Sequence, residues 1–452
     1  MKNIFLLLIG VCFTTYSHAQ QELGTHFMQD YWQSTYTNPG LMPNGRIIIG
    51  LPGLYNNLLV TNVTFDDILT KDENGDRRIN VSNAIPKLGP DNYVREDLDI
   101  ETVSLGLRLG KVMLTIGHKL RFNTFVNYPK TFPQLVWEGN AQFVGQNVEF
   151  GPDIQASAYH EIALGGAYQI GKHFTIGGRV KFLSGVTDVS TDRTKLSLYT
   201  SDDVYQLDLD ADFRVNTSGA LEYNGFDDLA IDFNFGRFET KNFLSKNSGM
   251  AFDLGATAKF GKLGLAASIL DIGEITWKEE AKNYSLLGHY EFQGLDIARD
   301  ILDDSTDIGS ALDTLQAIYE PTETSNSYKT KLPSRVYLSA TYQLTEKLQL
   351  GGLFYTERFR GENFPAVALS AQYQLNKYLR LGGLLAYRNE TFDNVGVNAA
   401  VVVGPVQVIA ATDNLLTVFS VSKHNNANLR LGVNFVLGEK ATETDKETES
   451  FF

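Results

Sequence analysis

Few residues in this sequence have types and spacings that could carry out chemistry, and none of them forms a catalytic motif. The seven histidines are scattered, and no two are spaced as a metal-binding pair. The chain has no Gly-x-Ser-x-Gly or His-Glu-x-x-His motif, no P-loop and no dinucleotide-binding glycine motif. We therefore predict that the protein is not an enzyme and uses no cofactor.

Two further sites are excluded or disfavoured by their residues. Cys12 is the only cysteine and lies in an apolar run at the amino end, so the mature chain has no disulfide and no thiolate metal site. Residues 72–76 (DENGD) resemble the opening of a calcium loop. The sixth position is Arg77 where a sharp turn requires glycine, and no acid stands at the twelfth. A surface turn is therefore favoured over a calcium or other metal site.

Charged residues inside otherwise alternating segments are the more informative set. Ionisable side chains on the lipid face of a barrel cost roughly 2–4 kcal/mol at mid-depth, so they belong inside it. They could line a permeation route, or they could form an internal ion-pair network that stiffens a closed barrel. We predict the following lumen-facing residues: Arg108, Lys119, Arg121, Asp253, Lys259, Arg380 and Arg430.

The elements that must position these residues are strands, because hydrophobicity alternates with period two along most of the chain. Residues 336–344 (VYLSATYQL), 367–375 (VALSAQYQL) and 429–437 (LRLGVNFVL) each alternate in this way. Each run has about 9–11 residues, the length that a tilted strand needs to cross a bilayer. After the amino end there is no apolar run of 18 residues, which excludes a helical membrane protein.

An internal repeat adds hairpins to this pattern. Residues 167–178 (AYQIGKHFTIGG) recur as 341–352 (TYQLTEKLQLGG) and again at 371–383, each as strand, short polar turn and strand. The other connections are long, at about 66–100, 126–157, 186–249 and 272–331. Short turns at one end and long loops at the other are typical of an outer-membrane barrel with periplasmic turns and extracellular loops.

We therefore predict an all-β fold, a transmembrane antiparallel β-barrel of about fourteen strands located in the cell outer membrane. Sixteen strands are the alternative if 186–248 contains a further hairpin, and a soluble β-sandwich is the rival architecture. The fourteen predicted strands are 46–60, 102–109, 112–125, 158–169, 174–185, 249–259, 263–271, 332–343, 347–356, 365–374, 379–388, 394–403, 406–412 and 428–437.

The ends of the chain complete the predicted organisation. Lys2, an apolar run and a small-residue exit make residues 1–19 a signal peptide. We then expect an N-terminal segment at 20–45, the barrel at 46–438 and a polar C-terminal tail at 439–452. Within the loop at 272–331, residues 305–319 have the spacing of an amphipathic helix, packed over the outer mouth or simply solvated. The formal charge of −14 argues against nucleic acid as a partner.

Two stretches resemble known barrel families. Residues 37–43 (TNPGLMP), followed by 51–53 (LPG), are similar to the Asn-Pro-Ala segment near the start of FadL-like barrels, the long-chain fatty-acid transporters, and of their Bacteroidota relatives. Gly40 stands where those barrels have alanine. Residues 404–407 (GPVQ) and 412–416 (TDNLL) look like a feature of a Bacteroidota outer-membrane barrel family of unknown function, DUF5723.

The resemblance implies a barrel whose amino-terminal segment plugs the lumen, with Asn38 and Pro39 in that plug. An ordinary Asn-Pro turn before the first strand is the other interpretation of these two residues. It also implies outer-membrane lipid around the barrel and uptake of a hydrophobic small molecule that leaves sideways through the wall. The alternative function is a non-transporting scaffold that works with secretion-system proteins, since other barrels of that phylum serve type IX secretion.

Overall fold

The computed structural model describes residues 22–71, 77–79, 81–203, 206–219, 221–223, 229–231, 245–293, 321–388, 391–419 and 423–438. Four expectations lie outside these residues: the signal peptide at 1–19, the calcium-like turn at 72–76, the helix at 305–319 and the tail at 439–452. Among the described residues, no helix is long and apolar enough to cross a membrane.

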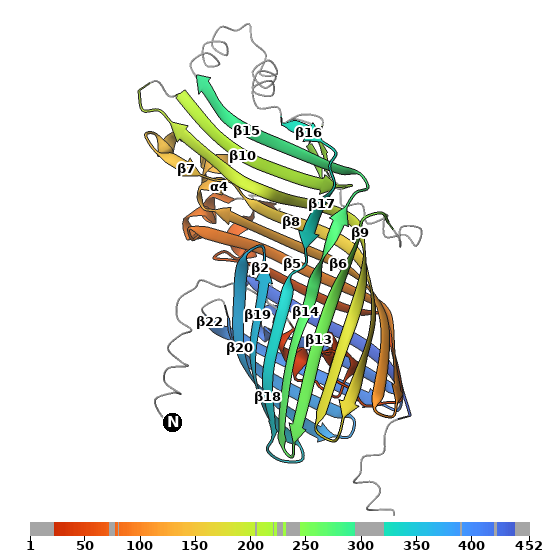
Figure 1. Cartoon of the computed structure of the whole chain (residues 1–452). Helices are drawn as coiled ribbons and strands as arrows, with labels where there is room; N and C mark the ends of the chain where they lie inside the picture. Colours follow the sequence, from red (N-terminus) through yellow and green to blue (C-terminus); the bar gives the residue numbers. More distant parts are fainter. Residues whose placement is uncertain are drawn as a thin grey trace, which may run out of the picture.

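Fourteen antiparallel strands form a closed ring, which confirms the predicted fold class and strand number (Figure 1). The ring closes where β24 pairs with both halves of the first strand, β1 and β2. In ring order the strands are β1 (Ile47–Gly50) with β2 (Gly53–Val60), β5 (Asp91–Leu109), β6 (Val112–Pro129), β8 (Asp153–Ile170), β9 (Phe174–Thr200), β13 (Ser248–Phe260), β14 (Leu263–Trp277), β18 (Ser334–Gln343), β19 (Leu348–Phe359), β20 (Glu362–Asn376), β21 (Leu379–Arg388), β22 (Thr391–Val403), β23 (Val406–Thr412) and β24 (Asn426–Leu437).

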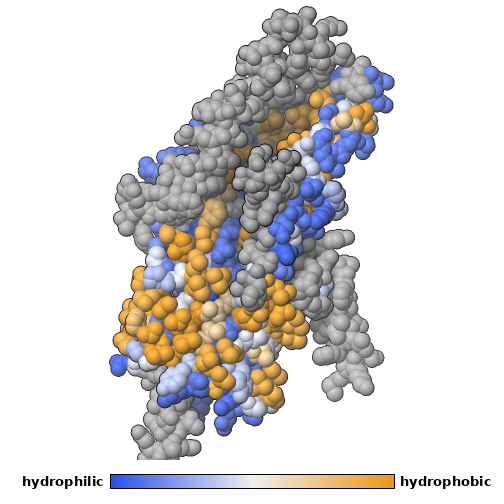
Figure 2. Space-filling view, turned by 180° about the vertical axis from the view of Figure 1, so that it is seen from behind, coloured by the Kyte–Doolittle hydropathy of each residue, from blue (hydrophilic) through white to orange (hydrophobic). Residues whose placement is uncertain are grey.

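The two faces of the wall differ in chemistry because the strand pleat sorts the alternating side chains. In β20, Val367 and Leu369 are exposed, whereas Ser370 and Gln372 are buried inside the ring. Exposed aliphatic and aromatic residues recur on almost every strand, and Figure 2 shows them gathered on the outer surface of the barrel. An apolar exterior around a polar interior is the inverse of a soluble protein, and it fits a barrel that faces lipid.

The predicted long loops are wrong in part, because several strands continue beyond the ring. β9 runs on to Thr200 and pairs there with β10 (Gln206–Ser218), which pairs in turn with β15 (Ala281–Gln293). The short strands β7 (Asn147–Glu149) and β16 (Thr322–Thr324) flank them. We call β7, β10, β15, β16 and the part of β9 that pairs with β10 the extension. In Figure 1 the extension projects from the loop end of the barrel. The hairpin suspected within 186–248 thus adds strands to the extension and none to the ring.

The remaining elements are short. β17 (Tyr328–Lys331) pairs with β14 beside β18, and two small hairpins lie apart from the main sheet: β3 (Leu69–Lys71) with β4 (Arg77–Ile79), and β11 (Leu221–Tyr223) with β12 (Leu229–Ile231). The other short helices among the described residues are α3 (Phe65–Ile68), η2 (Val81–Asn83), η3 (Ile85–Lys87), α4 (Thr131–Pro133), η4 (Gln134–Glu138), η5 (Ala141–Phe143) and α7 (Leu415–Phe419).

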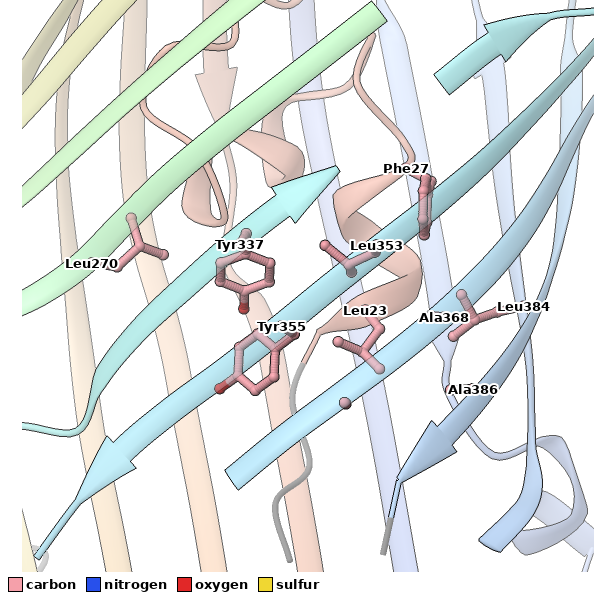
Figure 3. Packing of buried hydrophobic residues seen from close by; sticks show 10 residues of the cluster. Leu23, Phe27, Leu270, Tyr337, Leu353, Tyr355, Ala368, Leu384 and Ala386 are labelled. Carbon is pink, nitrogen blue, oxygen red and sulfur yellow. The ribbon is translucent and has the colours of Figure 1, made fainter. Parts of the chain in front are cut away.

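The first described residues lie inside the ring. The helix α2 (Leu23–His26) and the 3-10 helix η1 (Trp32–Tyr36) are buried, and Figure 1 shows this part of the chain within the barrel. Leu23 and Phe27 pack against inward residues of β18 and β19, including Tyr337 and Tyr355 (Figure 3). We call residues 22–45 the N-terminal segment. Its packing gives the inside of this barrel a hydrophobic core of its own.

Candidate functional site: the filled lumen

Every second side chain of a ring strand points inward, and in β5 these side chains are charged. Arg95, Asp97, Asp99 and Glu101 occupy alternate positions, and all four are buried. The residues between them face outward, as the 41% exposure of Ile100 illustrates. Burying a charge without a partner is strongly unfavourable. Asp97 is paired with Arg95 of the same strand, whereas Asp99 and Glu101 require cations from other strands.

Asp271 lies at the centre of the first group of ion pairs. Its carboxylate accepts a hydrogen bond from Arg121 Nη1 at 3.2 Å and also contacts Lys181 and Arg335. The backbone at Asp271 is left-handed, with φ of 58°, and its N–H donates to Asp253 Oδ1 at 2.8 Å. Asp253 Oδ2 in turn lies 2.9 Å from Lys181 Nζ. One carboxylate in an uncommon backbone conformation thus meets three cations from three other strands.

A second group of ion pairs is continuous with the first. Arg430 Nη1 lies 2.9 Å from Glu22 Oε1, and the same guanidinium contacts Glu101. Lys119 Nζ lies 3.3 Å from Glu101 Oε1 and 3.8 Å from Asp99 Oδ2. We call the joined groups the lumen charge network. Its six acids and six bases, which balance formally, are Glu22, Asp99, Glu101, Glu161, Asp253, Asp271, Lys119, Arg121, Arg179, Lys181, Arg335 and Arg430.

Four of the seven charged residues predicted from the sequence lie in this network: Lys119, Arg121, Asp253 and Arg430. Arg380 forms a separate pair with Asp30 of the N-terminal segment, with Nη1 2.5 Å from Oδ2. Arg108 and Lys259 lie beside short turns, on inward-alternating positions, and among the described residues neither forms an ion pair. The structure therefore brings together the residues predicted at mid-height and leaves two at the turn end apart.

Eight members of the network are not among the residues predicted from the sequence. Asp99 falls in the stretch assigned to a loop at 66–100, and Glu101 lies between that loop and the predicted strand at 102–109, although the two acids alternate with Leu98 and Ile100. That alternation is the signal that could have identified them. For Asp271 there is no such signal, because the register of β13 against β14 shifts just before it.

The N-terminal segment is held by hydrogen bonds to strands far away in sequence. Asp413 accepts from the backbone N–H of Leu23 at 3.0 Å and of Gly24 at 2.9 Å. Gln33 and Asn434 exchange two side-chain hydrogen bonds, each 3.0 Å long. A buried amide pair satisfied in both directions fixes the position of η1 against β24.

Aromatic contacts tie the same segment to the charge network. Tyr36 lies between two cations: Lys119 Nζ is 3.4 Å from its ring centroid, and the Arg430 guanidinium is 5.0 Å away. His26 is fully buried, with Nδ1 2.9 Å from Thr37 Oγ1 and Nε2 2.8 Å from Ser339 Oγ. The segment therefore contributes a carboxylate, an aromatic ring and hydrogen-bonding groups to the interior.

Asn38, Pro39 and Gly40 lie directly against the wall. Asn38 Nδ2 donates to the backbone carbonyls of residues 256 and 267, at 3.2 Å each, and its Oδ1 accepts from Gly40 N–H at 2.7 Å. The wall residues that they face are Gly177 and Gly255. A Cβ on either would overlap the Asn38–Gly40 backbone or the Asn38 side chain. Close approach of two backbones is a specific use of glycine, and here it joins the segment to β9 and β13.

The other face of the same wall is hollowed. An apolar depression of about 840 Å³ crosses the outer surface of β8, β9, β13 and β14. Its floor includes Gly178, next to Gly177 in sequence but on the opposite face of β9, and Ala256, next to Gly255. We call it the outer hollow. It is lined by Val112, Gly166, Ala167, Tyr168, Ile176, Gly177, Gly178, Leu254, Gly255, Ala256, Ala267, Ser268, Ile269, Val336 and Leu338.

Two hollows among the described lumen residues are much smaller. One of about 30 Å³ lies between Trp32, Tyr36 and Lys119, and one of about 10 Å³ lies beside Arg95 and Arg121. A space of roughly 10–15 Å³ holds one water molecule. In this conformation, neither of these two spaces could admit an organic ligand.

One set of side chains has donor atoms suited to a metal ion, and it lies on the extension. Asp208, His289 and Glu291 place ligand atoms within 4.8 Å of one another on β10 and β15. The hydrogen bond from His289 Nδ1 to Asp210, 2.8 Å long, raises the pKa of the imidazole. Glu291 Oε1 lies 3.5 Å from its other nitrogen. These contacts already account for the cluster as an exposed ion-pair group.

The closed ring, the apolar exterior and the charge-balanced interior together define a β-barrel of the outer-membrane type. The chain belongs to the family of unknown function DUF5723, whose model matches residues 39–413. That range begins at Pro39, at the contact with the wall, and ends at Asp413, the residue that holds the start of α2.

Solved barrels with a similar course include the toluene transporter TbuX of Ralstonia pickettii, 11% identical over 90% of this chain and 94% of that one, with a TM-score of 0.43. A Pseudomonas aeruginosa FadL homologue is 10% identical over 90% and 95%, with a TM-score of 0.41. The NalP translocator domain of Neisseria meningitidis is 8% identical over 94% and 99%, with a TM-score of 0.33. No curated protein matches the sequence. At these values the similarities carry no functional argument.

Proposed function

We propose that this barrel carries an apolar small molecule across the outer membrane and releases it sideways through the wall at the outer hollow. The observation that carries the proposal is the pair of glycine contacts at Gly177 and Gly255. There the wall is backbone alone, with the N-terminal segment against one face and an apolar depression in the other. A ligand displaced from water into such a depression would enter lipid directly.

The route requires the N-terminal segment to move, because it occupies the lumen in this conformation. Its anchors are hydrogen bonds and ion pairs, such as Asp413 with the start of α2 and Glu22 with Arg430. A polar contact can be exchanged for water, whereas the apolar packing of Leu23 and Phe27 must be replaced by other apolar groups. A hydrophobic ligand supplies such groups, so ligand entry and segment movement are coupled in this proposal.

A disulfide that locks the segment tests the route. A Cβ at position 432 of β24 would lie 3.1 Å from Gln33 Cγ, the position that the Sγ of a cysteine at 33 would take, so the two side chains are close enough for a disulfide. The double variant Gln33→Cys/Gly432→Cys is placed in vesicles, and uptake of the fluorescent apolar probe N-phenyl-1-naphthylamine is followed. Oxidation should abolish protein-dependent uptake, and reduction should restore it. The two single variants are the controls, because each introduces one of the two cysteines but cannot form the disulfide.

Two results would count against this function. Unchanged uptake in a barrel shown by gel mobility to be fully cross-linked would mean that the segment need not move. Absence of protein-dependent uptake in the reduced double variant and in the unaltered protein would favour the second candidate, a non-transporting scaffold. The observation that favours the scaffold is the extension, a sheet that adds outer surface without contributing to the ring. Recovery of stoichiometric protein partners from native membranes would then identify its role.

A further inference from the structure

The short turns at one end of the barrel share a feature that the proposed function does not use. Five of the six short turns that join neighbouring ring strands at this end carry one lysine each, and all five lysines are exposed. The sixth turn, at Gly404 and Pro405, has none. The five are Lys111, Lys172, Lys262, Lys347 and Lys377.

Further bases lie at the same end. Arg46 follows the N-terminal segment and donates its backbone N–H to Leu437 O at 3.0 Å, beside the end of β24. We call the whole set the basic rim: Arg46, Arg108, Lys111, Lys172, Lys259, Lys262, Lys347, Lys377 and Arg380. Among the described residues at this end, the acids are Asp30, paired with Arg380, and Glu346. Nine bases against two acids give +7, in a chain whose total formal charge is −14.

A belt of exposed aromatic residues lies immediately next to the basic rim. Its members are 43–50% exposed and lie in or next to the few residues at the turn ends of the strands that the turns connect: Tyr168, Phe174, Phe260, Tyr342, Tyr373 and Tyr378. Aromatic belts of this kind mark the level of the membrane–water interface in barrels. Lys377 Nζ lies 4.9 Å from the ring centroid of Tyr378, so the ammonium group and the belt are adjacent. The five turn lysines therefore lie at the depth of the lipid headgroups.

We propose that the five turn lysines of the basic rim bind the phosphate groups of anionic phospholipids in the leaflet that surrounds the turn end. Anionic lipid attracts clustered lysines close to the membrane surface. The arrangement also favours lipid over an acidic protein. The lysines are distributed one per turn around the circumference, on the β5–β6, β8–β9, β13–β14, β18–β19 and β20–β21 turns. A leaflet encloses such a ring from all sides, whereas a docked protein would contact one arc of it.

The test compares two variants with the same change in charge. The rim variant carries Lys→Gln at the five turn positions. The control variant carries Lys→Gln at five exposed lysines of the loop end: Lys195, Lys246, Lys278, Lys329 and Lys331. Each full chain is reconstituted into nanodiscs of equimolar phosphatidylglycerol and phosphatidylcholine and then extracted in mild detergent. Mass spectrometry measures the ratio of the two lipids that remain bound, and heat-dependent gel mobility verifies that each barrel is folded.

We expect the rim variant to lose at least about tenfold of the enrichment in phosphatidylglycerol, and the control variant to retain it. Equal enrichment in the two variants, or an equal loss in both, overturns the proposal. A parallel arm adds inorganic phosphate to nanodiscs of the unaltered protein. If millimolar phosphate displaces the bound lipid, the rim is a site for the free anion and the lipid assignment is wrong. None of these results depends on whether the barrel transports anything.

Discussion

Asp271 shows how much a single side chain can contribute to a lumen filled with ions. It meets Arg121, Lys181 and Arg335, which come from three different strands, and its own backbone is left-handed. A left-handed backbone costs a residue other than glycine of the order of 1–3 kcal/mol. The surrounding contacts must outweigh that cost. The position is therefore sensitive to loss of charge.

Replacing this carboxylate by an amide should destabilise the barrel strongly. Asp271→Asn leaves three buried cations with one fewer anion, and breaking a buried pair costs about 3–5 kcal/mol. Urea unfolding monitored by gel mobility measures the change in free energy. The matched control is Asp192→Asn, which removes an exposed partner of Arg214 and should cost about 0–1 kcal/mol. Equal losses in the two variants would show that the network does not stabilise the ring.

Two neighbouring glycines of β9 permit an equally direct test of the contact between the N-terminal segment and the barrel wall. A Cβ at Gly177 would overlap the carbonyl of Pro39, whereas a Cβ at Gly178 would lie 3.4 Å from the nearest atom, on the outer face. We expect Gly177→Ala to cost about 1–3 kcal/mol by overpacking and to expose the N-terminal segment to protease. Gly178→Ala should do neither. If both variants behave alike, the segment does not lie against β9 as described.

At the scale of elements, the extension contains a buried carboxyl group that is hydrogen-bonded by hydroxyl groups. Asp188 lies on β9 beyond the last residue that pairs with β13. It is buried and accepts hydrogen bonds from Ser157, Ser190 and Tyr328. Burial raises the pKa of this carboxyl to about 6, and the hydroxyl donors only partly offset that effect. The extension therefore contains a group that titrates in a mildly acidic medium.

The sign of the resulting pH dependence follows from proton binding. Between pH 4 and 6 the folded extension holds a proton on Asp188 that the opened form releases. Its contribution to stability is complete below pH 4 and is lost as pH rises through 6, by up to about 1.4 kcal/mol per pH unit. The protection factors of β8 and β9 amides near this residue, which are corrected for the intrinsic pH dependence of amide exchange, should fall accordingly. Asp188→Asn should remove the dependence, and a slope unchanged in that variant would rule out this carboxyl as its source.

Most of the ring strands could be predicted from the sequence. A strand with lipid on one face and a polar lumen on the other must alternate between apolar and polar residues. The hairpin repeat at 167–178, 341–352 and 371–383 and the short turns gave the correct ring of fourteen strands. The extension could not be predicted in this way. Residues 206–218 (QLDLDADFRVNTS) alternate as a strand should, but alternation does not say whether a strand joins the ring or a sheet beyond it.

At the scale of the whole molecule, the sequence could not predict which lumen side chains contact one another. Charges such as Arg121 and Arg430 could be assigned to the lumen from the pleat alone. Their partners could not, because ring closure brings together residues whose separation in sequence carries no periodic signal. Glu22 and Arg430 are one example, and Asn38 with the carbonyls of β13 and β14 is another.

The seam between β1 and β24 sets the order in which this molecule can be assembled. The ring cannot complete its hydrogen bonds until the last strand is available, and the N-terminal segment, made first, binds Asp413 and Asn434, 390 and 401 residues later. Contacts of such long range are slow to form because the loop that they close is long. Leu23 and Gln33 therefore cannot make these contacts until nearly the whole chain has been synthesised. Closing the seam and filling the interior thus both depend on the last residues of the barrel, Asp413 through β24.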